Sequence, residues 1–236
     1  MRSATRKTLK TSMSKMISAP SRLFAIGDLH LPGGLNKTME MFGDRWDRHF
    51  EKIQDDWRQR VSEDDLVLIP GDISWAMQLS GALEDLMAIA ALPGRKILIR
   101  GNHDYWWTSI SRVRESLPDR MFALQQSAVD CEAFCVCGTR GWMFPGSETG
   151  LTRDDERIFQ REQIRLRMAL EDAKKMAGDR PVVVMLHYPP LNREIQDTSF
   201  TELLEEYHVA VCVYGHLHGK GIASAFEGEH HGVEYY

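Results

Sequence analysis

The sequence is poor in the features that would place it in a special class of protein. Its 236 residues include only four cysteines, and no apolar run approaches the roughly 18 to 20 residues that a membrane-spanning helix needs. It contains no internal repeat. Hydrophobic residues make up 43% of the chain and charged residues 27%, which is ordinary for a globular protein and excludes a disordered chain. We therefore expect a soluble, cytoplasmic protein.

Three of the four cysteines, Cys131, Cys135 and Cys137, are crowded into one short segment, and Cys212 lies in an apolar run. Two interpretations of these cysteines are open. A Cys-x3-Cys-x-Cys zinc or redox site is the more specific one. Buried, reduced thiols are favoured, because Cys135 and Cys137 alternate with apolar residues as strand residues do.

Acidic residues are missing from the first 22 positions, which hold six basic residues, so the rest of the chain carries 23 basic against 34 acidic residues. A body this acidic repels a phosphate backbone, which argues against nucleic acid as a partner. Any anionic substrate would need a local cation. We expect residues 1–20 to be a disordered basic extension rather than an organelle transit peptide, and residues 21–236 to form a single domain.

Five short apolar runs end in polar residues of the kind that bind ligands. These predicted strands are 23–26 before Gly-Asp-Leu-His, 66–69 before Pro-Gly-Asp, 97–99 shortly before Gly-Asn-His-Asp, 182–186 before His-Tyr-Pro-Pro, and 209–214 before Gly-His-Leu-His. Layered α/β folds place their active sites at the carboxyl ends of strands, where the loops converge. The sequence therefore predicts one site built from five loops.

Between these runs, apolar residues recur with helical spacing. One amphipathic helix is predicted from a stripe that we expect to be core rather than a ligand platform: Trp46, Phe50, Ile53, Trp57 and Val61. Further helices are expected at 80–92 and 154–177, and further strands at 121–129, 134–138 and 221–236. The pattern indicates an α/β fold in which two packed sheets have helices outside.

Five of the nine histidines lie in the strand-end clusters, next to aspartate and asparagine: His30, His103, His187, His216 and His218, beside Asp28, Asp72, Asn102 and Asp104. One such histidine would usually be structural, but five at equivalent positions favour metal ligands. Mixed imidazole, carboxylate and amide ligands suit Mn, Fe or Zn. The candidate ligands are too many for one ion, and a carboxylate such as Asp72 can bridge two metal ions. A dinuclear centre is therefore predicted.

The order Asp-x-His, Gly-Asp, Gly-Asn-His-Asp, His and Gly-His-x-His, between residues 23 and 218, resembles the calcineurin-like metallophosphoesterases. Within that family, residues 71–77, 101–107 and 138–142 look like a bacterial group of predicted phosphohydrolases, which implies no particular substrate. The resemblance implies a four-layer sandwich, with two mixed β-sheets flanked by helices.

The resemblance also implies roles for the site residues. Two sets of ligands share one carboxylate: Asp28, His30, Asp72 and His218 for one divalent or trivalent ion, and Asp72, Asn102, His187 and His216 for the other. His103 matches the family's imidazole near the leaving-group oxygen, with Asp104 as its orienting partner. The alternative is that His103 is simply a further ligand.

The function predicted from these residues is hydrolysis of a small phosphomonoester or phosphodiester. A hydroxide that bridges the two ions would attack phosphorus in line, Asn102 and His103 would help to stabilise charge, and His103 would donate a proton to the departing alcohol. Four residues beside the motifs either line a substrate pocket or only pack, and this choice stays open: Trp106, Trp107, Arg140 and Trp142.

Two other functions are alternatives for this sequence. A non-catalytic scaffold of the same fold is disfavoured, because such relatives tend to lose ligands and this chain retains them all. A nuclease would need a basic patch, for which Arg112, Arg114 and Arg140 are candidates. The series at 153, 157, 161 and 165 recurs every four residues, which is more typical of one solvated helix face paired with acidic residues.

Overall fold

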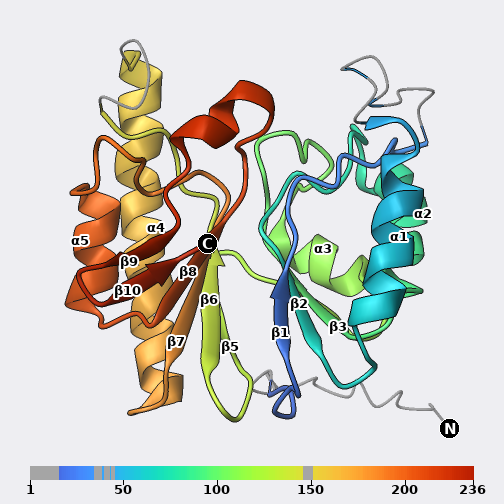
Figure 1. Cartoon of the computed structure of the whole chain (residues 1–236), viewed down its shortest axis with the longest axis horizontal. Helices are drawn as coiled ribbons and strands as arrows, with labels where there is room; N and C mark the ends of the chain where they lie inside the picture. The colour runs from blue at the N-terminus through green and yellow to red at the C-terminus, as the bar shows by residue number, and fades with distance from the viewer. Residues whose placement is uncertain (1–15, 35–38, 40–42, 44–45, 146–150) are drawn as a thin grey trace, which may run out of the picture.

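Short, mostly apolar strands build two β-sheets that pack face to face (Figure 1). The computed structural model describes residues 16–34, 39, 43, 46–145 and 151–236. The first sheet has the order β1-β2-β3-β4, and its strands are β1 Leu23–Ala25, β2 Leu66–Ile69, β3 Arg95–Leu98 and β4 Met121–Ala123. The second has the order β5-β6-β7-β8-β10-β9, and its strands are β5 Ser127–Asp130, β6 Cys135–Thr139, β7 Val182–Leu186, β8 Val211–Tyr214, β9 Gly228–His230 and β10 Val233–Tyr235.

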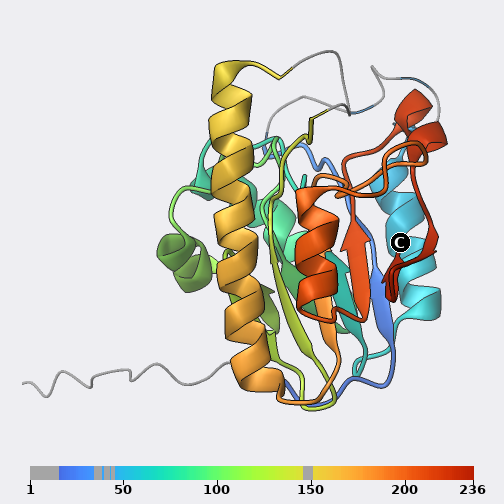
Figure 2. The same ribbon diagram turned by 90° about the vertical axis from the view of Figure 1, so that its left-hand side faces the viewer.

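Helices cover the outer face of each sheet. The helices beside the first sheet are α1 His49–Arg60, α2 Leu79–Ala90 and α3 Ile110–Ser116 (Figure 1). Those over the second sheet are α4 Arg153–Ala177 and α5 Ser199–Glu206 (Figure 2). The 3-10 helix η3 Gly219–Ser224 follows β8. The predicted four-layer α/β sandwich is confirmed. Among the described residues, no helix is both long and apolar enough to cross a membrane.

Alternation along the strands explains how both faces of a sheet are buried. In β2, Leu66 and Leu68 lie in the core between the sheets, whereas Val67 and Ile69 pack under the helices of the first sheet. Successive side chains of a strand point to opposite faces, so a run of apolar residues fills two cores at once. This is why the parallel strands appear in the sequence as unbroken apolar runs.

The resemblance implied that both sheets are mixed, but only the second sheet is. Every pair in the first sheet is parallel. In the second sheet, β5 and β9 run antiparallel to their neighbours, while β6, β7, β8 and β10 are parallel. The antiparallel strands belong to two hairpins, which need only short turns, whereas each parallel step needs a longer crossover.

The single strand expected at 121–129 is in fact two strands in different sheets. β4 pairs with β3, and β5 pairs with β6, so the chain crosses from one sheet to the other between them. Gln126 in this crossing has a φ of 48°, in the left-handed region. The polar residues Gln125, Gln126 and Ser127 interrupt the segment at this point, but polar residues within a strand pattern do not by themselves show that the chain changes sheet. The predicted strand at 221–236 likewise divides, into η3 and the hairpin of β9 and β10.

Helix α1 begins at His49, so Trp46 lies before it and not in its core stripe. Trp57 and Val61 are buried as expected, with exposed fractions of 4% and 9%. Trp46 is only partly buried, and its ring contacts are with histidines. The spacing of Trp46 suited the stripe, but the helix does not extend back to it.

The last residues of the expected N-terminal extension belong to the folded body. Residues 1–15 lie outside the described part of the chain. Met16 forms a β-bridge with Asp130, the Ile17 amide donates to the Asp130 carbonyl at 2.7 Å, and the Ile17 side chain is only 3% exposed. A single isoleucine gives no periodic signal, so the sequence alone places the boundary at residue 20 although the folded body begins earlier.

We expect Ile17→Ala to lower the free energy of unfolding by about 2 to 5 kcal/mol, because it leaves a cavity in the core between the sheets. Urea denaturation followed by circular dichroism measures this. Met16→Ala is the matched control: its side chain is 66% exposed, so the change should stay within about 0.5 kcal/mol. Equal stability of the two variants would contradict the packing of Ile17.

Candidate metal centre

The loops that follow β1, β2, β3, β7 and β8 converge at one end of the molecule, the upper end in Figure 1. They carry all seven residues that the sequence predicts as metal ligands: Asp28, His30, Asp72, Asn102, His187, His216 and His218. The adjacent parallel strands place the loops side by side, so residues separated by up to 190 positions in the chain meet there.

Asp28, His30 and His218 form the first group, each offering a ligand atom within 4.8 Å of the others. The Nε2 atom of His30 lies 3.8 Å from Asp28 Oδ1 and 3.7 Å from Asp72 Oδ2. These distances are too long for hydrogen bonds. They leave space between the ring nitrogen and the two carboxylates for a cation that all three groups contact.

A second group brings Asp72 together with Asp28 and His187, again within 4.8 Å. His187 Nε2 lies 3.5 Å from Asp72 Oδ2 and 2.6 Å from Asn102 Oδ1, which is also 3.0 Å from His216 Nδ1. Asp72 Oδ2 thus faces imidazoles of both predicted ligand sets. This is the position that a bridging carboxylate would need.

Several polar atoms at this centre are buried without a hydrogen-bond partner among the described residues: Asp28 Oδ1, Asp72 Oδ2, and both ring nitrogens of His30. Leaving charged groups buried and unpaired is costly. Burial raises the pKa of Asp28 to about 7 and, together with the nearby Asp104, raises that of Asp72 to about 8. Bound cations would compensate these carboxylates and displace their protons.

Burial has the opposite effect on the imidazoles. It lowers the pKa of His30 to about 3 and that of His216 to about 4, with neighbouring histidines adding to both shifts. Neutral imidazole is the form that binds metals. The donor set of neutral imidazoles, buried carboxylates and one amide oxygen therefore fits two transition-metal ions.

The backbone is strained at four of these residues. Asp28, His30, Asp72 and His216 have φ values of 55°, 46°, 52° and 72°, in the left-handed region that costs a non-glycine residue about 1 to 3 kcal/mol. The loops hold the strain by mutual hydrogen bonds, such as those from the His216 amide to Asp28 Oδ2 at 2.8 Å and from the His30 amide to the Asp72 carbonyl at 2.9 Å. Strain of this kind concentrates at functional sites.

Two glycines of the motifs let the carboxylates come this close. A Cβ atom at Gly101 would lie 2.1 Å from Asp72 Oδ1, and one at Gly215 would lie 2.6 Å from Asp28 Oδ2. Either contact would push the carboxylate out of place. These positions are restricted to glycine by the space that Asp28 and Asp72 occupy.

His103 borders the first group. Its ring centroid lies 5.6 Å from that of His30 and 4.5 Å from that of Trp75, and its amide donates to Asp72 Oδ1 at 2.8 Å. Its Nδ1 atom is buried and has no hydrogen-bond partner among the described residues. Burial, and then the neighbouring His218, lower the pKa of His103.

The expectation that Asp104 orients the His103 ring is wrong. Asp104 is fully buried, and its oxygens accept hydrogen bonds from four other donors: the amides of Ile73 at 2.8 Å, Ser74 at 3.1 Å and Gly101 at 2.7 Å, and the indole of Trp106 at 2.9 Å. These bonds tie the loop after β2 to the loop after β3. Asp104 therefore acts on the site by holding two ligand-bearing loops together.

We expect Asp104→Asn to lower the free energy of unfolding by about 2 to 4 kcal/mol, because an amide group would face donors that now meet a carboxylate oxygen. Chemical denaturation measures the loss. Asp154→Asn, an exposed change in the first turn of α4, is the control and should cost much less. Unchanged stability of Asp104→Asn would show that the four bonds contribute little.

The aromatic residues beside the motifs mostly pack. Trp106 and Trp107 are 0% and 1% exposed. The ring of Trp142 packs against that of Tyr188 at a tilt of 50° and lies under the Arg140 guanidinium. The aromatic residues beside the predicted ligands include Trp75 and Trp46, which contact His30, and Tyr188, which contacts His187 and His216. The sequence reasoning did not select them as site residues. Trp75 directly follows the Gly-Asp-Ile-Ser motif, which was the available signal. All four cysteines are buried and unpaired, and the candidate metal groups of the described chain include none of them.

Comparison with known proteins identifies the fold independently. The family model of the calcineurin-like phosphoesterases matches residues 21–220. Among solved structures, the phosphopantetheinyl hydrolase of Mycobacterium tuberculosis is similar, with 14% identity, a TM-score of 0.54, and coverage of 94% of this chain and 88% of that one. A protein of unknown function from Aquifex aeolicus matches with 16% identity, a TM-score of 0.45, and coverage of 84% and 80%. No curated protein matches.

The family match begins just before β1 and ends just after the last predicted ligand, so it includes all five strand-end clusters. It accounts for most of the chain. This protein therefore belongs to the calcineurin-like phosphoesterase family.

Proposed function

We propose that the protein hydrolyses a phosphoester at a dinuclear metal centre held by Asp28, His30, Asp72, Asn102, His187, His216 and His218. Membership of the family implies metal-dependent phosphoester hydrolysis. The observation that carries the finer proposal is the position of Asp72 Oδ2. This atom is buried, has no hydrogen-bond partner in the part of the chain that the structure describes, and lies within 3.7 Å of imidazoles from both ligand sets. One carboxylate oxygen shared in this way suits a pair of ions rather than a single ion.

Two bound ions would supply the positive charge that neutralises phosphoryl oxygens and activates a water for attack. The chain's own residues prepare that site. Asp72 and Asn102 point side-chain oxygens at its centre. The His103 amide holds Asp72 in place by donating a hydrogen bond to Oδ1, the oxygen that does not face the imidazoles. The His103 ring lies at the edge of the first group, where it can donate a proton or hydrogen bond to the departing alcohol oxygen.

The two alternative functions gain no support from the geometry. A scaffold would not need the strained backbone and the buried carboxylates, and all seven predicted ligands are assembled here. A nucleic-acid surface on α4 is not supported either, because Arg157 pairs with Asp154 at 3.2 Å and Arg165 pairs with Glu162 at 2.6 Å. The exposed face of α4 therefore carries both acidic and basic side chains, and ion pairs neutralise part of its positive charge.

The test is a panel of phosphomonoesters and phosphodiesters, assayed with protein that has been stripped of metal and reloaded with Mn, Fe, Zn or Mg. Turnover should be absent after stripping and should return with a transition-metal ion. The ratio of monoester to diester turnover assigns the substrate type. Absence of hydrolysis with every ion and ester would contradict the proposal.

A further inference from the structure

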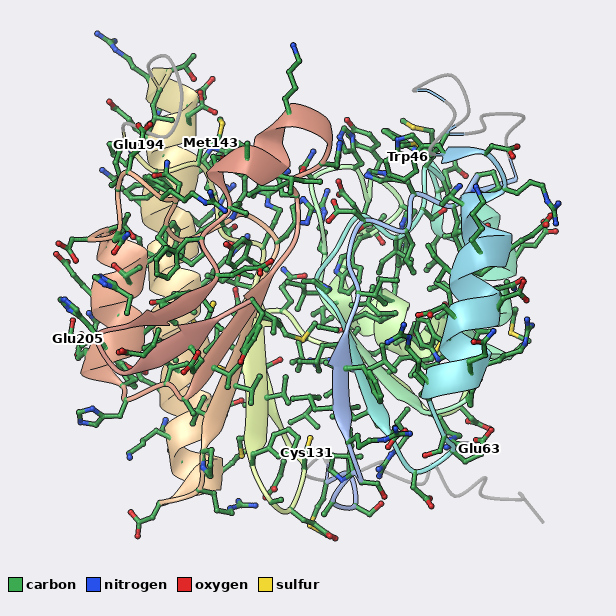
Figure 3. The ribbon with its side chains drawn as sticks, viewed as in Figure 1. Trp46, Glu63, Cys131, Met143, Glu194 and Glu205 are labelled. Carbon is green, nitrogen blue, oxygen red and sulfur yellow. The ribbon has the colours of Figure 1, made fainter. Side chains whose placement is uncertain are left out.

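A cavity of about 380 Å³ opens beside the candidate metal centre, on the side of His103. Two indoles, one thioether, three imidazoles and a glycine line it, among them Trp46, Trp75 and Met39. Among the residues that the structure describes, no lysine, arginine, aspartate or glutamate takes part in this lining. In Figure 3, Trp46 lies above the first sheet, at the end of the molecule where the ligand-bearing loops meet. The cavity is large enough for a small molecule, and the described part of its wall suits an aromatic or other uncharged group.

The indole of Trp75 is already engaged by the protein. It stacks on His30 with centroids 4.9 Å apart and planes at 24°, and it also contacts His103 at 4.5 Å. Its Nε1 donates to Met39 Sδ at 3.3 Å. These contacts make Trp75 a fixed wall between the metal centre and the cavity.

The indole of Trp46 meets its aromatic neighbours differently. Its plane lies at 78° to the ring of His30, 76° to that of His49 and 89° to that of His218, with centroids 5.3 to 6.0 Å apart. Among the described residues, no ring stacks parallel to it. A planar group that entered the cavity could therefore stack on this indole, an arrangement that aromatic pairs favour.

We infer that the substrate is a phosphoester whose leaving alcohol carries a planar aromatic group, and that this group binds in the cavity against Trp46. The inference rests on the proposed function, in which His103 assists the leaving group. His103 lines this cavity, whereas the smaller cavity of about 160 Å³ on the other side of the centre is lined by His216 and does not include His103. The leaving group belongs on the side where its proton donor lies.

Matched esters separate recognition of the aromatic group from chemistry. We would compare 2-(1-naphthyl)ethyl phosphate, 2-cyclohexylethyl phosphate and ethyl phosphate, whose leaving alcohols have similar pKa values. The wild-type protein should show a kcat/KM for the naphthyl ester about 10 to 100 times that for the ethyl ester, because stacking on an aromatic side chain has that effect on binding. A cyclohexyl ester that is hydrolysed as well as the naphthyl ester would overturn the assignment of a planar group.

Variants of Trp46 locate the recognition. Trp46→Ala should reduce the ratio of naphthyl to ethyl kcat/KM to nearly one, and Trp46→Phe should retain much of it. Trp142→Ala is the matched control, because Trp142 packs on Tyr188 outside this cavity, so the ratio should stay at the wild-type value. Circular dichroism checks that each variant is folded. A ratio that Trp46→Ala leaves unchanged would refute the inference.

A binding measurement makes the outcome independent of turnover. Calorimetry with the metal-loaded protein should show that 2-(1-naphthyl)ethylphosphonate, which is not hydrolysed, binds about 10 to 100 times more tightly than ethylphosphonate, and that Trp46→Ala removes the difference. If no ester is hydrolysed but this difference is found, the proposed function fails and the aromatic site stands. If the esters are hydrolysed and no difference is found, the proposed function stands and the aromatic site fails.

Discussion

Asp72→Asn is expected to lower the metal content of the purified protein from about two ions per chain to about one or fewer, and to abolish measurable phosphoester hydrolysis. Asp72 Oδ2 lies 3.7 Å from His30 Nε2 and 3.5 Å from His187 Nε2, between the two ligand sets. Asparagine removes the negative charge, and its NH2 group would face either the ions or the His103 amide, which now meet carboxylate oxygens. Elemental analysis of dialysed, folded protein measures the number of ions.

Asp85→Asn is the matched control, because it makes the same chemical change at a buried carboxylate outside the centre. The Gly33 amide and the Ser74 hydroxyl both donate to Asp85 Oδ2, so an asparagine carbonyl can accept both bonds. This variant should keep its metal content. One ion in the wild-type protein, or an unchanged count in Asp72→Asn, would contradict the dinuclear proposal.

The location of the site could be predicted because its signals are local in the sequence. Each candidate ligand follows directly on a short apolar run, and parallel strands bring such ends together whatever the length of the crossovers. His30 and His218, for example, lie 188 positions apart, yet their ring centroids are 5.5 Å apart. The prediction that these two histidines lie together needed only the observation that each follows a predicted strand.

What could not be predicted depends on tertiary contacts that leave no local pattern. Asp104 is adjacent to His103 in the sequence, yet its carboxylate is turned towards the amides of Ile73 and Ser74 in another loop. Trp46 suited the period of α1, yet the helix begins after it and the indole lies by the cavity. Sequence adjacency and helical periodicity predict contacts only within one helix or loop. They gave wrong predictions for Asp104 and Trp46, whose contacts are with other segments of the chain.

Because Asp104 bonds to other groups and not to the His103 ring, the role of His103 has to be considered again. No carboxylate of the described residues bonds to its ring, and burial and His218 lower the pKa of His103, so the described surroundings favour the neutral ring. A neutral imidazole still donates through its N–H group, and a proton on the ring would be favoured by the negative charge of a bound phosphoester. The role of His103 is therefore decided by its dependence on the leaving group.

His103→Gln is expected to lower turnover of an alkyl phosphoester by about two to four orders of magnitude while the metal content stays near the wild-type value. Glutamine can donate a hydrogen bond, but it cannot transfer a proton to a poor leaving group. The loss should be much smaller for 4-nitrophenyl phosphate, whose leaving group departs as a stable anion. Steady-state kinetics on both esters, with elemental analysis of the same samples, measure the difference.

His208→Gln is the control for this experiment, because His208 is exposed, follows α5 and belongs to none of the candidate metal groups of the described chain. It should behave as the wild-type protein on both esters. An equal loss on the two esters for His103→Gln would show that His103 binds the phosphoryl group instead of protonating the leaving group. A fall in metal content would make His103 a ligand, and the neighbouring cavity would then lose its assignment as the leaving-group side.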